Sequence, residues 1–152
     1  APNFSVGMNL FYRLVREAAL LYGSAGLHQP FVHEAHHRAK KDVPSGTARK
    51  LASILVQSDP KLDGVHEGNP AEPLPDNLLH VSSVRAGGEP GSHTVGYDGE
   101  HDKITLTHAA RSRAGFALGA VLAAEWLVES GAKGIHGFDA VLDARVRSGG
   151  RR

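Results

Sequence analysis

Apolar side chains recur at intervals of three and four residues in three segments of the chain. Such spacing is typical of helices, so we predict helices over residues 6–22, 45–57 and 116–128. Ser5 is the expected N-cap of the first helix, and Gly23 follows its predicted end. The third segment is apolar on nearly every side, and we therefore expect that helix to be well buried.

Shorter segments between these helices alternate apolar and polar residues, which is typical of strands. We expect strands over residues 31–36, 78–85, 92–97 and 103–108. The last two would pair antiparallel, and their alternation indicates a sheet with one buried face. Residues 58–77 hold four prolines and are predicted to be a surface loop. The order favours an α+β domain with a mostly antiparallel or mixed sheet of about four strands, covered by helices.

Composition narrows the class of protein. The 152 residues suffice for one domain with a real core, and no apolar run approaches the length of a membrane span. Lys and Arg total 17 against 16 for Asp and Glu, without the basic excess of a nucleic-acid binder. There is no cysteine and no signal-peptide pattern, so we expect a cytoplasmic protein with no membrane or nucleic-acid partner.

The segment from His36 to Thr47 concentrates the chemistry of the chain. Two imidazoles and three cations are followed by a turn, Pro44-Ser45-Gly46-Thr47, and then by the second predicted helix. The first turn of a helix offers unpaired N–H groups to an anion, and glycine lets a ligand approach the backbone. His36 and Lys40 can also donate protons. Each feature alone also fits a plain helix start or solvated side chains, but together they predict a site for a small, multiply anionic molecule.

Two other kinds of site are not expected. The ten histidines follow no zinc signature, and His33-Glu34-Ala35-His36 falls one residue short of His-Glu-x-x-His, so we predict no metal. No Gly-x-Gly-x-x-Gly fingerprint is present, so the chain does not supply a Rossmann cofactor site by itself.

Several motifs, in order along nearly the whole chain, resemble the bacterial dihydrodipicolinate reductases, also called 4-hydroxy-tetrahydrodipicolinate reductases. The most specific block runs from Glu34-Ala35-His36-His37-Arg38 to Asp42-Val43-Pro44-Ser45-Gly46-Thr47-Ala48. The remaining matches are Ala1-Pro2-Asn3-Phe4-Ser5-Val6-Gly7, Val84-Arg85-Ala86-Gly87, Thr107-His108 with Ser112-Arg113, and Phe116-Ala117-x-Gly119-Ala120-Val121.

The resemblance implies an enzyme of lysine and diaminopimelate biosynthesis that reduces a cyclic dicarboxylate with NADPH or NADH. Residues 1–130 would form the substrate-binding and homotetramerisation domain, and residues 131–152 a C-terminal tail that returns to the nucleotide-binding domain. By the same resemblance, we expect the N-terminal Rossmann domain of the family to be absent from this chain. Because the chain lacks an initiator Met, we expect a piece of a longer polypeptide. Without the nucleotide-binding domain we expect the chain alone to be inactive.

The resemblance also implies roles for individual residues. His36 would be the acid/base residue and Lys40 the proton donor. The substrate carboxylates would be held by His37, Gly46, Thr47 and Arg113, and the cofactor would be touched by Ala1, Pro2, Asn3 and Phe4. Two other functions stay open: a non-catalytic dicarboxylate-binding or oligomerisation module, and, less well supported, a histidine-rich metal protein.

Overall fold

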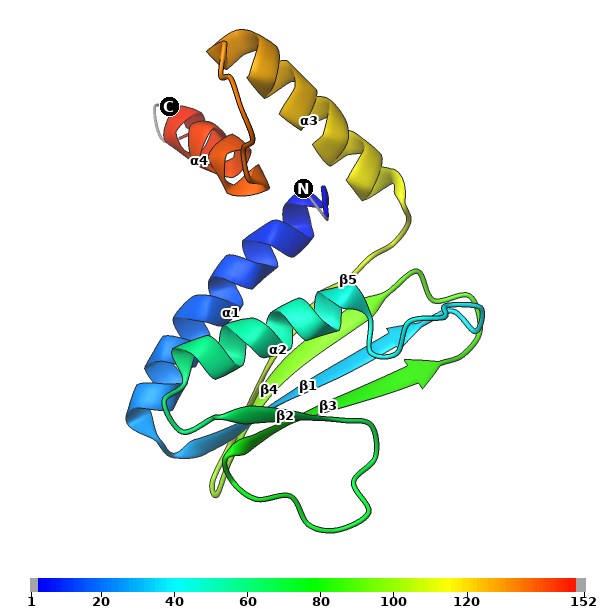
Figure 1. The fold of residues 1–152 in the computed structure, drawn as a ribbon, viewed down its shortest axis with the longest axis vertical. Helices are drawn as coiled ribbons and strands as arrows, with labels where there is room; N and C mark the ends of the chain where they lie inside the picture. The colour runs from blue at the N-terminus through cyan, green and yellow to red at the C-terminus, as the bar shows by residue number, and fades with distance from the viewer. Residues whose placement is uncertain (1–2, 150–152) are drawn as a thin grey trace. The chain divides into compact units, whose positions relative to one another are not determined.

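The computed structural model describes residues 3–149. Its elements, drawn in Figure 1, are α1 (Val6–Ala25), β1 (His28–His36), α2 (Gly46–Ser58), β2 (Gly64–Glu67), β3 (Leu78–Arg85), β4 (Ser92–Gly99), β5 (Lys103–Ala109), α3 (Ala114–Ser130) and α4 (Phe138–Gly149). The chain divides into two compact units. We call residues 12–111 the sheet unit, and residues 1–11 with 112–152 the helical unit.

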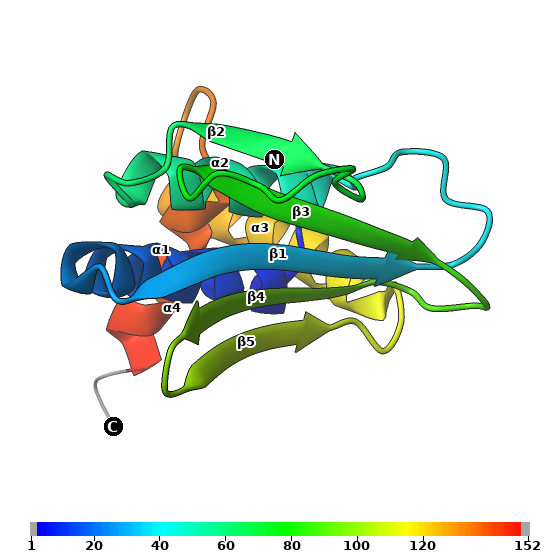
Figure 2. The same cartoon turned by 90° about the horizontal axis from the view of Figure 1, so that it is seen from below.

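The sheet unit is built on five strands in the order β2-β3-β1-β4-β5. The pairs β2/β3 and β3/β1 are parallel, whereas β1/β4 and β4/β5 are antiparallel. Figure 2 shows the strands in this order, with α2 and the sheet unit's part of α1 behind them. The predicted α+β class with a mixed sheet is therefore confirmed, with one strand more than expected.

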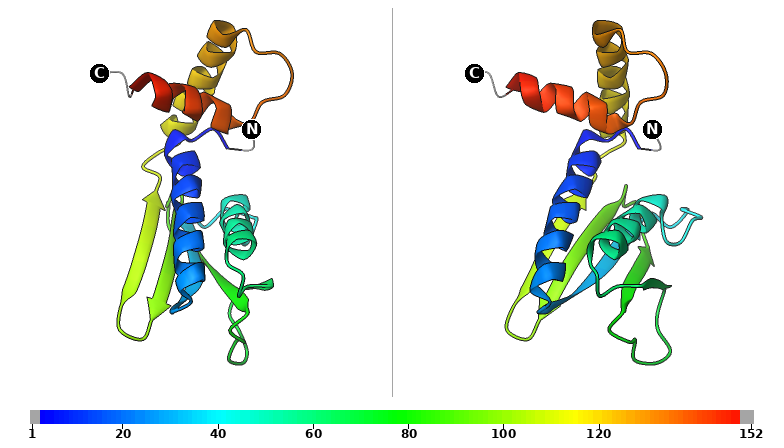
Figure 3. Two further views of the ribbon diagram at one scale, coloured as in Figure 1. Left: turned by 90° about the vertical axis from the view of Figure 1, so that its left-hand side faces the viewer. Right: turned by 60° about the vertical axis from the view of Figure 1, so that its left-hand side comes forward.

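The extra strand, β2, lies inside the segment predicted to be a surface loop. Its four residues, Gly64–Glu67, run parallel to the start of β3, and residues 68–77 then form the long loop at the end of the sheet (Figure 3). The loop prediction was therefore wrong for residues 64–67. A strand this short between prolines carries too few residues to show an alternation.

One face of the sheet carries the core. Strand side chains that point toward the helices are buried, among them Val32 on β1, Val81 on β3 and Val95 on β4. Leu51 and Leu55 of α2 fill the space above them, both at 0% exposure. The ring of Tyr22 on α1 stacks on Tyr97 of β4 with centroids 4.5 Å apart. Both helices thus cover the same face, and the opposite face of the sheet is open within this unit.

The first helix begins as predicted but ends later. The Ser5 hydroxyl accepts a hydrogen bond from the Met8 backbone N–H at 3.2 Å, which is the expected N-cap. Gly23 lies inside α1 instead of after it. A Cβ at this position would stand 2.9 Å from the Asp59 carboxyl carbon, so the close approach favours glycine. Gly26, with φ of 69°, follows the helix end.

The helical unit has its own small core. Phe138, Val141 and Leu142 of α4 are buried against apolar side chains of α3 and the N-terminal segment, including Phe4 and Trp126. The sequence did not predict α4, which lies in the segment described as a tail. The expectation that α3 is well buried was wrong for the described chain, since only Gly119 is buried in it. Its apolar residues point in all directions, and α4 with the N-terminal segment covers one side.

Candidate functional site

The end of β1 directs two polar side chains into the buried face. Alternation along the strand places Glu34 and His36 on the same side as Val32, beneath the first turn of α2. The strand register pairs Glu34 with His93 of β4 and His36 with Arg85 of β3. Three neighbouring strands therefore contribute ionisable groups to one place at the edge of the core.

Glu34 is completely buried, and both of its carboxylate oxygens have polar partners. Its Oε1 accepts hydrogen bonds from the Arg85 guanidinium at 2.6 Å and from the Ser45 backbone N–H at 3.2 Å. Burial by itself would raise the pKa of this carboxyl, but the bonds from Arg85 and Ser45 and the nearby His36 outweigh it and lower the pKa to about 2. Glu34 is thus a buried carboxylate that stays charged.

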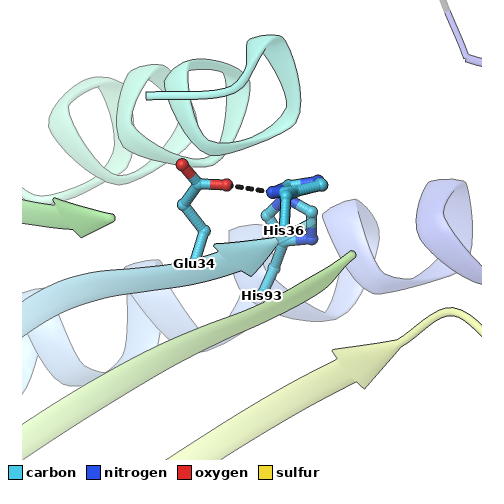
Figure 4. Close-up of side chains that lie close together, drawn as sticks. All are labelled: Glu34, His36 and His93. Atoms are coloured by element: carbon cyan, nitrogen blue, oxygen red, sulfur yellow. Dashed lines mark ion pairs between the residues drawn. The ribbon is translucent and has the colours of Figure 1, made fainter. Parts of the chain in front are cut away.

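His36 faces that carboxylate. Its Nδ1 forms an ion pair with Glu34 Oε2, as the dashed line in Figure 4 marks. Burial lowers the pKa of His36, the charge of Glu34 raises it, and Lys40 and Arg85 lower it further. The other ring nitrogen, Nε2, lies against Gly91, where a Cβ would approach it to 2.7 Å.

His93 stands edge-on to His36, with ring centroids 5.1 Å apart (Figure 4). Its Nε2 lies 3.1 Å from the Ser45 hydroxyl, which also accepts the Ala48 N–H as the N-cap of α2. Burial, followed by the proximity of His36, lowers the pKa of His93 to about 4. His93 is therefore neutral at physiological pH and joins β4 to the first turn of α2.

Residues 36–47 form what we call the strand–helix corner. The corner is anchored by backbone bonds to the β3–β4 loop, such as His37 N–H to Glu89 O at 2.8 Å. The Lys40 ammonium pairs with the Asp42 carboxylate at 2.7 Å, and that carboxylate also accepts the Gly46 N–H at 3.2 Å. These contacts, with that of Lys40 first, lower the pKa of Asp42 to about 2. A cation and a helix N-terminus thus already share one carboxylate in the corner.

The corner contains five of the ten site residues that the sequence singled out. His36 is buried, His37, Lys40 and Thr47 are half-buried, and Gly46 is exposed with nothing within 4 Å of the position of a Cβ. That open space leaves room for a small ligand at the first turn of α2.

The remaining predicted site residues lie outside the sheet unit. Arg113 precedes α3, and its carbonyl accepts the Phe116 N–H at 3.1 Å. Asn3 accepts the Ser5 N–H at 2.8 Å. Phe4 packs edge-on against Phe138. Ala1 and Pro2 lie outside the described residues.

Sequence reasoning missed four residues that complete the site: Glu34, Asp42, Arg85 and His93. A weak signal existed for Glu34, because a residue two positions before His36 in a strand must point to the same face. Arg85 and His93 come from other strands, and only the register reveals them.

A metal ion is one alternative occupant of this cluster. Glu34, His36 and His93 each offer a ligand atom within 4.8 Å of the others. However, the Arg85 guanidinium lies 2.6 Å from the same carboxylate and opposes a further cation. Separately, the helices within residues 3–149 include none with the length and apolar character needed to span a bilayer.

Comparison with known proteins gives consistent results. The model of the family described as "Dihydrodipicolinate reductase, C-terminus" matches residues 7–142. A 4-hydroxy-tetrahydrodipicolinate reductase of Chromohalobacter salexigens is 44% identical over 86% of this chain and 50% of its own length. One from Methanopyrus kandleri is 42% identical over 99% of this chain and 54% of its own length.

A solved structure also resembles the chain. The dipicolinate-bound dihydrodipicolinate reductase of Paenisporosarcina sp. TG-14 superposes with a TM-score of 0.66 and 28% identity, over 85% of this chain and 49% of that one. The chain spans about half the length of the curated relatives it matches. The match over residues 7–142, together with these relatives, shows that this chain belongs to the C-terminal domain family of the dihydrodipicolinate reductases.

Proposed function

We propose that this chain is the substrate-binding part of a 4-hydroxy-tetrahydrodipicolinate reductase. In this role it binds a cyclic dicarboxylate and delivers the proton that accompanies hydride addition. The names of its relatives support the reductase, and the dipicolinate held by the related structure supports a small cyclic diacid. The reaction would belong to lysine and diaminopimelate biosynthesis in the cytoplasm.

The observation that carries the proposal is the strand–helix corner. It combines a buried His36 with the Lys40 ammonium and the N–H groups that start α2. An ammonium and a helix N-terminus both favour carboxylates, so two such groups suit a diacid. His37 and the Gly46-Thr47 backbone would hold the carboxylates, and the family resemblance adds Arg113 as a further proposed substrate-binding residue.

Proton transfer would fall to His36 and Lys40. Adding a hydride to a ring C=N or C=C bond leaves an electron pair on the neighbouring atom, which must take up a proton. His36 as imidazolium or Lys40 as ammonium can release that proton, and solvent can restore it afterwards. Lys40 would first have to exchange the Asp42 carboxylate for that of the ligand.

The described residues do not form a nucleotide site by themselves. The first turn of α2 has a glycine with open space beside it, and we assign it to the substrate. NADPH or NADH supplies the hydride when bound, and we propose that a separate nucleotide-binding domain holds it. Asn3 and Phe4, which follow Ala1 and Pro2 in the sequence, would lie near that domain, and residues 131–152 would return to it.

We also propose that four copies assemble through the open face of the sheet. Within the sheet unit the helices cover only the other face, and the open face carries Phe31 and a hydrogen-bonded pair, Thr94 and Thr107. Sedimentation equilibrium should give a mass of about four chains, and a monomer at all concentrations would contradict this part of the proposal.

Titration calorimetry with pyridine-2,6-dicarboxylate tests the binding site. Lys40→Ala should weaken binding about tenfold to a hundredfold, because a charge-assisted bond is lost. Lys103→Ala is the matched control: its ammonium also pairs with an aspartate, Asp98, at 2.7 Å, but on the β4–β5 hairpin. Equal affinity in the Lys40 variant and the wild type would refute the assignment.

Turnover is tested in the full polypeptide that includes a nucleotide-binding domain, by following NADPH or NADH oxidation. His36→Ala and Lys40→Ala should each lower kcat by about a hundredfold or more. Wild-type rates in both variants would end the catalytic assignment. Diacid binding without any turnover in the wild type would favour the non-catalytic module instead.

A further inference from the structure

We infer that Glu34 is a positioning residue that fixes the imidazole ring of His36. In this arrangement Nδ1 carries a hydrogen that points to the buried Glu34 carboxylate, and Nε2 is the nitrogen that exchanges protons with the ligand. The consequence for catalysis depends on the proposed function, in which His36 is the acid/base residue. The tautomer and the orientation of the ring do not depend on it.

The carboxylate of Glu34 is held from both sides. Oε1 receives the Arg85 guanidinium at 2.6 Å and the Ser45 N–H at 3.2 Å, which leaves Oε2 to face His36 Nδ1. The side chain has no exposed surface, so water cannot replace these partners. A carboxylate fixed in this way accepts a hydrogen bond from one ring nitrogen only, here Nδ1. It therefore selects the tautomer with hydrogen on Nδ1.

His93 fixes the plane of the same ring from the β4 side. Its ring stands at 75° to that of His36, and its Nε2 is tied to the Ser45 hydroxyl. Ser45 therefore contacts both Glu34 and His93 while capping α2. The orientation of His36 is thus coupled to the first turn of α2, where we propose that the ligand carboxylate binds.

Charged and titratable groups face His36 from several elements. Lys40 of the corner and Arg85 of β3 each disfavour an added positive charge on the imidazole, and the ring of His93 faces it from β4. Glu34 is the group among these that favours it. If the charge of Glu34 is removed, only burial and the neighbouring cations act on the pKa of His36, and both lower it. His36 should then be protonated only at lower pH.

A purely structural role for Glu34, as a partner that holds Ser45 and Arg85 together, makes different predictions. Such a residue would affect stability and not the protonation of one particular imidazole. A metal-ligand role would also differ, because a bound Zn²⁺ would displace the Nδ1 proton. The tests below separate these possibilities.

The first test uses the wild-type chain of 152 residues and needs no variant. Long-range proton–nitrogen correlation spectra report which nitrogen of a neutral histidine carries hydrogen. We expect His36 to be protonated at Nδ1, whereas a free histidine prefers Nε2. A neutral His36 with hydrogen on Nε2 would overturn the inference, as would stoichiometric Zn²⁺ binding that shifts the same signals.

The second test compares Glu34→Gln with Glu67→Gln. Glu67 is the matched control, because it also pairs with an arginine, Arg49 at 3.1 Å, but is partly exposed on β2. Glu34→Gln should lower the pKa of His36 by about one unit or more in NMR titration, and the control should not change it. In the full reductase, Glu34→Gln should lower kcat about tenfold near pH 7 and change KM by less than about twofold.

The outcomes separate the two proposals. An unchanged His36 pKa in a folded Glu34→Gln variant refutes the positioning role. If the variant does not fold, the tautomer of the wild type decides the question. Absence of diacid binding and turnover would refute the proposed function, while an Nδ1 proton on His36 would still support this inference.

Discussion

His93 should make the sheet unit sensitive to acid. The residue is buried, with 5% of its surface exposed. Burial, followed by the nearby His36, lowers its pKa from the ordinary value of 6.5 to about 4. The unfolded chain binds a proton at this histidine near pH 6.5, whereas the folded chain does so only near pH 4. Between these values the unfolded state holds more protons, so the free energy of unfolding decreases as the pH falls.

The size of the effect follows from the two pKa values. Lowering the pH from about 7 to about 4.5 should remove about 2 kcal/mol of stability through His93 alone. His93→Gln removes the titration while keeping a donor near Ser45. The variant should be less stable at neutral pH but should lose about 2 kcal/mol less than the wild type over this interval.

Urea unfolding at several pH values measures this difference. The three tyrosines of the chain, Tyr12, Tyr22 and Tyr97, all belong to the sheet unit, so their near-ultraviolet dichroism reports on its unfolding. Trp126 belongs to the helical unit and is unsuitable. The exposed His101→Gln is the control. Parallel pH dependences in the wild type and the His93 variant would refute the reasoning.

Two further predictions concern other parts of the molecule. Asp42→Asn should increase the affinity for pyridine-2,6-dicarboxylate about fivefold in calorimetry. The Asp42 carboxylate pairs with the Lys40 ammonium at 2.7 Å, and the variant would no longer compete with the ligand for that ammonium. Weaker binding would contradict this view. Gly119→Ala should destabilise the helical unit by about 1–3 kcal/mol in urea unfolding followed by tryptophan fluorescence, since the new Cβ would stand 1.7 Å from the Phe4 carbonyl oxygen. Gly115→Ala in the same helix meets nothing within 4 Å and should be neutral or stabilising, so equal effects of the two substitutions would count against the steric argument.

Features that depend on neighbouring residues were predictable from the sequence. The stripe of α2 and the alternation of β5 are local patterns, and the structure confirms the elements that they predict. The corner was recognisable for the same reason, because His36, Lys40 and Gly46 lie within one short segment. Their catalytic and binding roles stay predictions, as do those of Arg113 and the N-terminal residues.

Features that depend on distant residues were not predictable. Glu34 and Arg85 are 51 positions apart and meet only because β1 and β3 are parallel neighbours. His93 reaches the corner through the antiparallel register of β4. The burial of α3 was predicted wrongly because a helix that is apolar on all sides does not reveal how much of it the rest of the chain covers.

The two-residue period of β1 makes this site unusually intolerant of changes in strand length. His33 and Ala35 point to the open face, while Glu34 and His36 point to the helices. Deleting one residue between Val32 and Glu34 would exchange these sets, so that the acid and its imidazole would enter solvent and an alanine would face Arg85. Single-residue insertions and deletions in this strand should therefore be absent from functional copies.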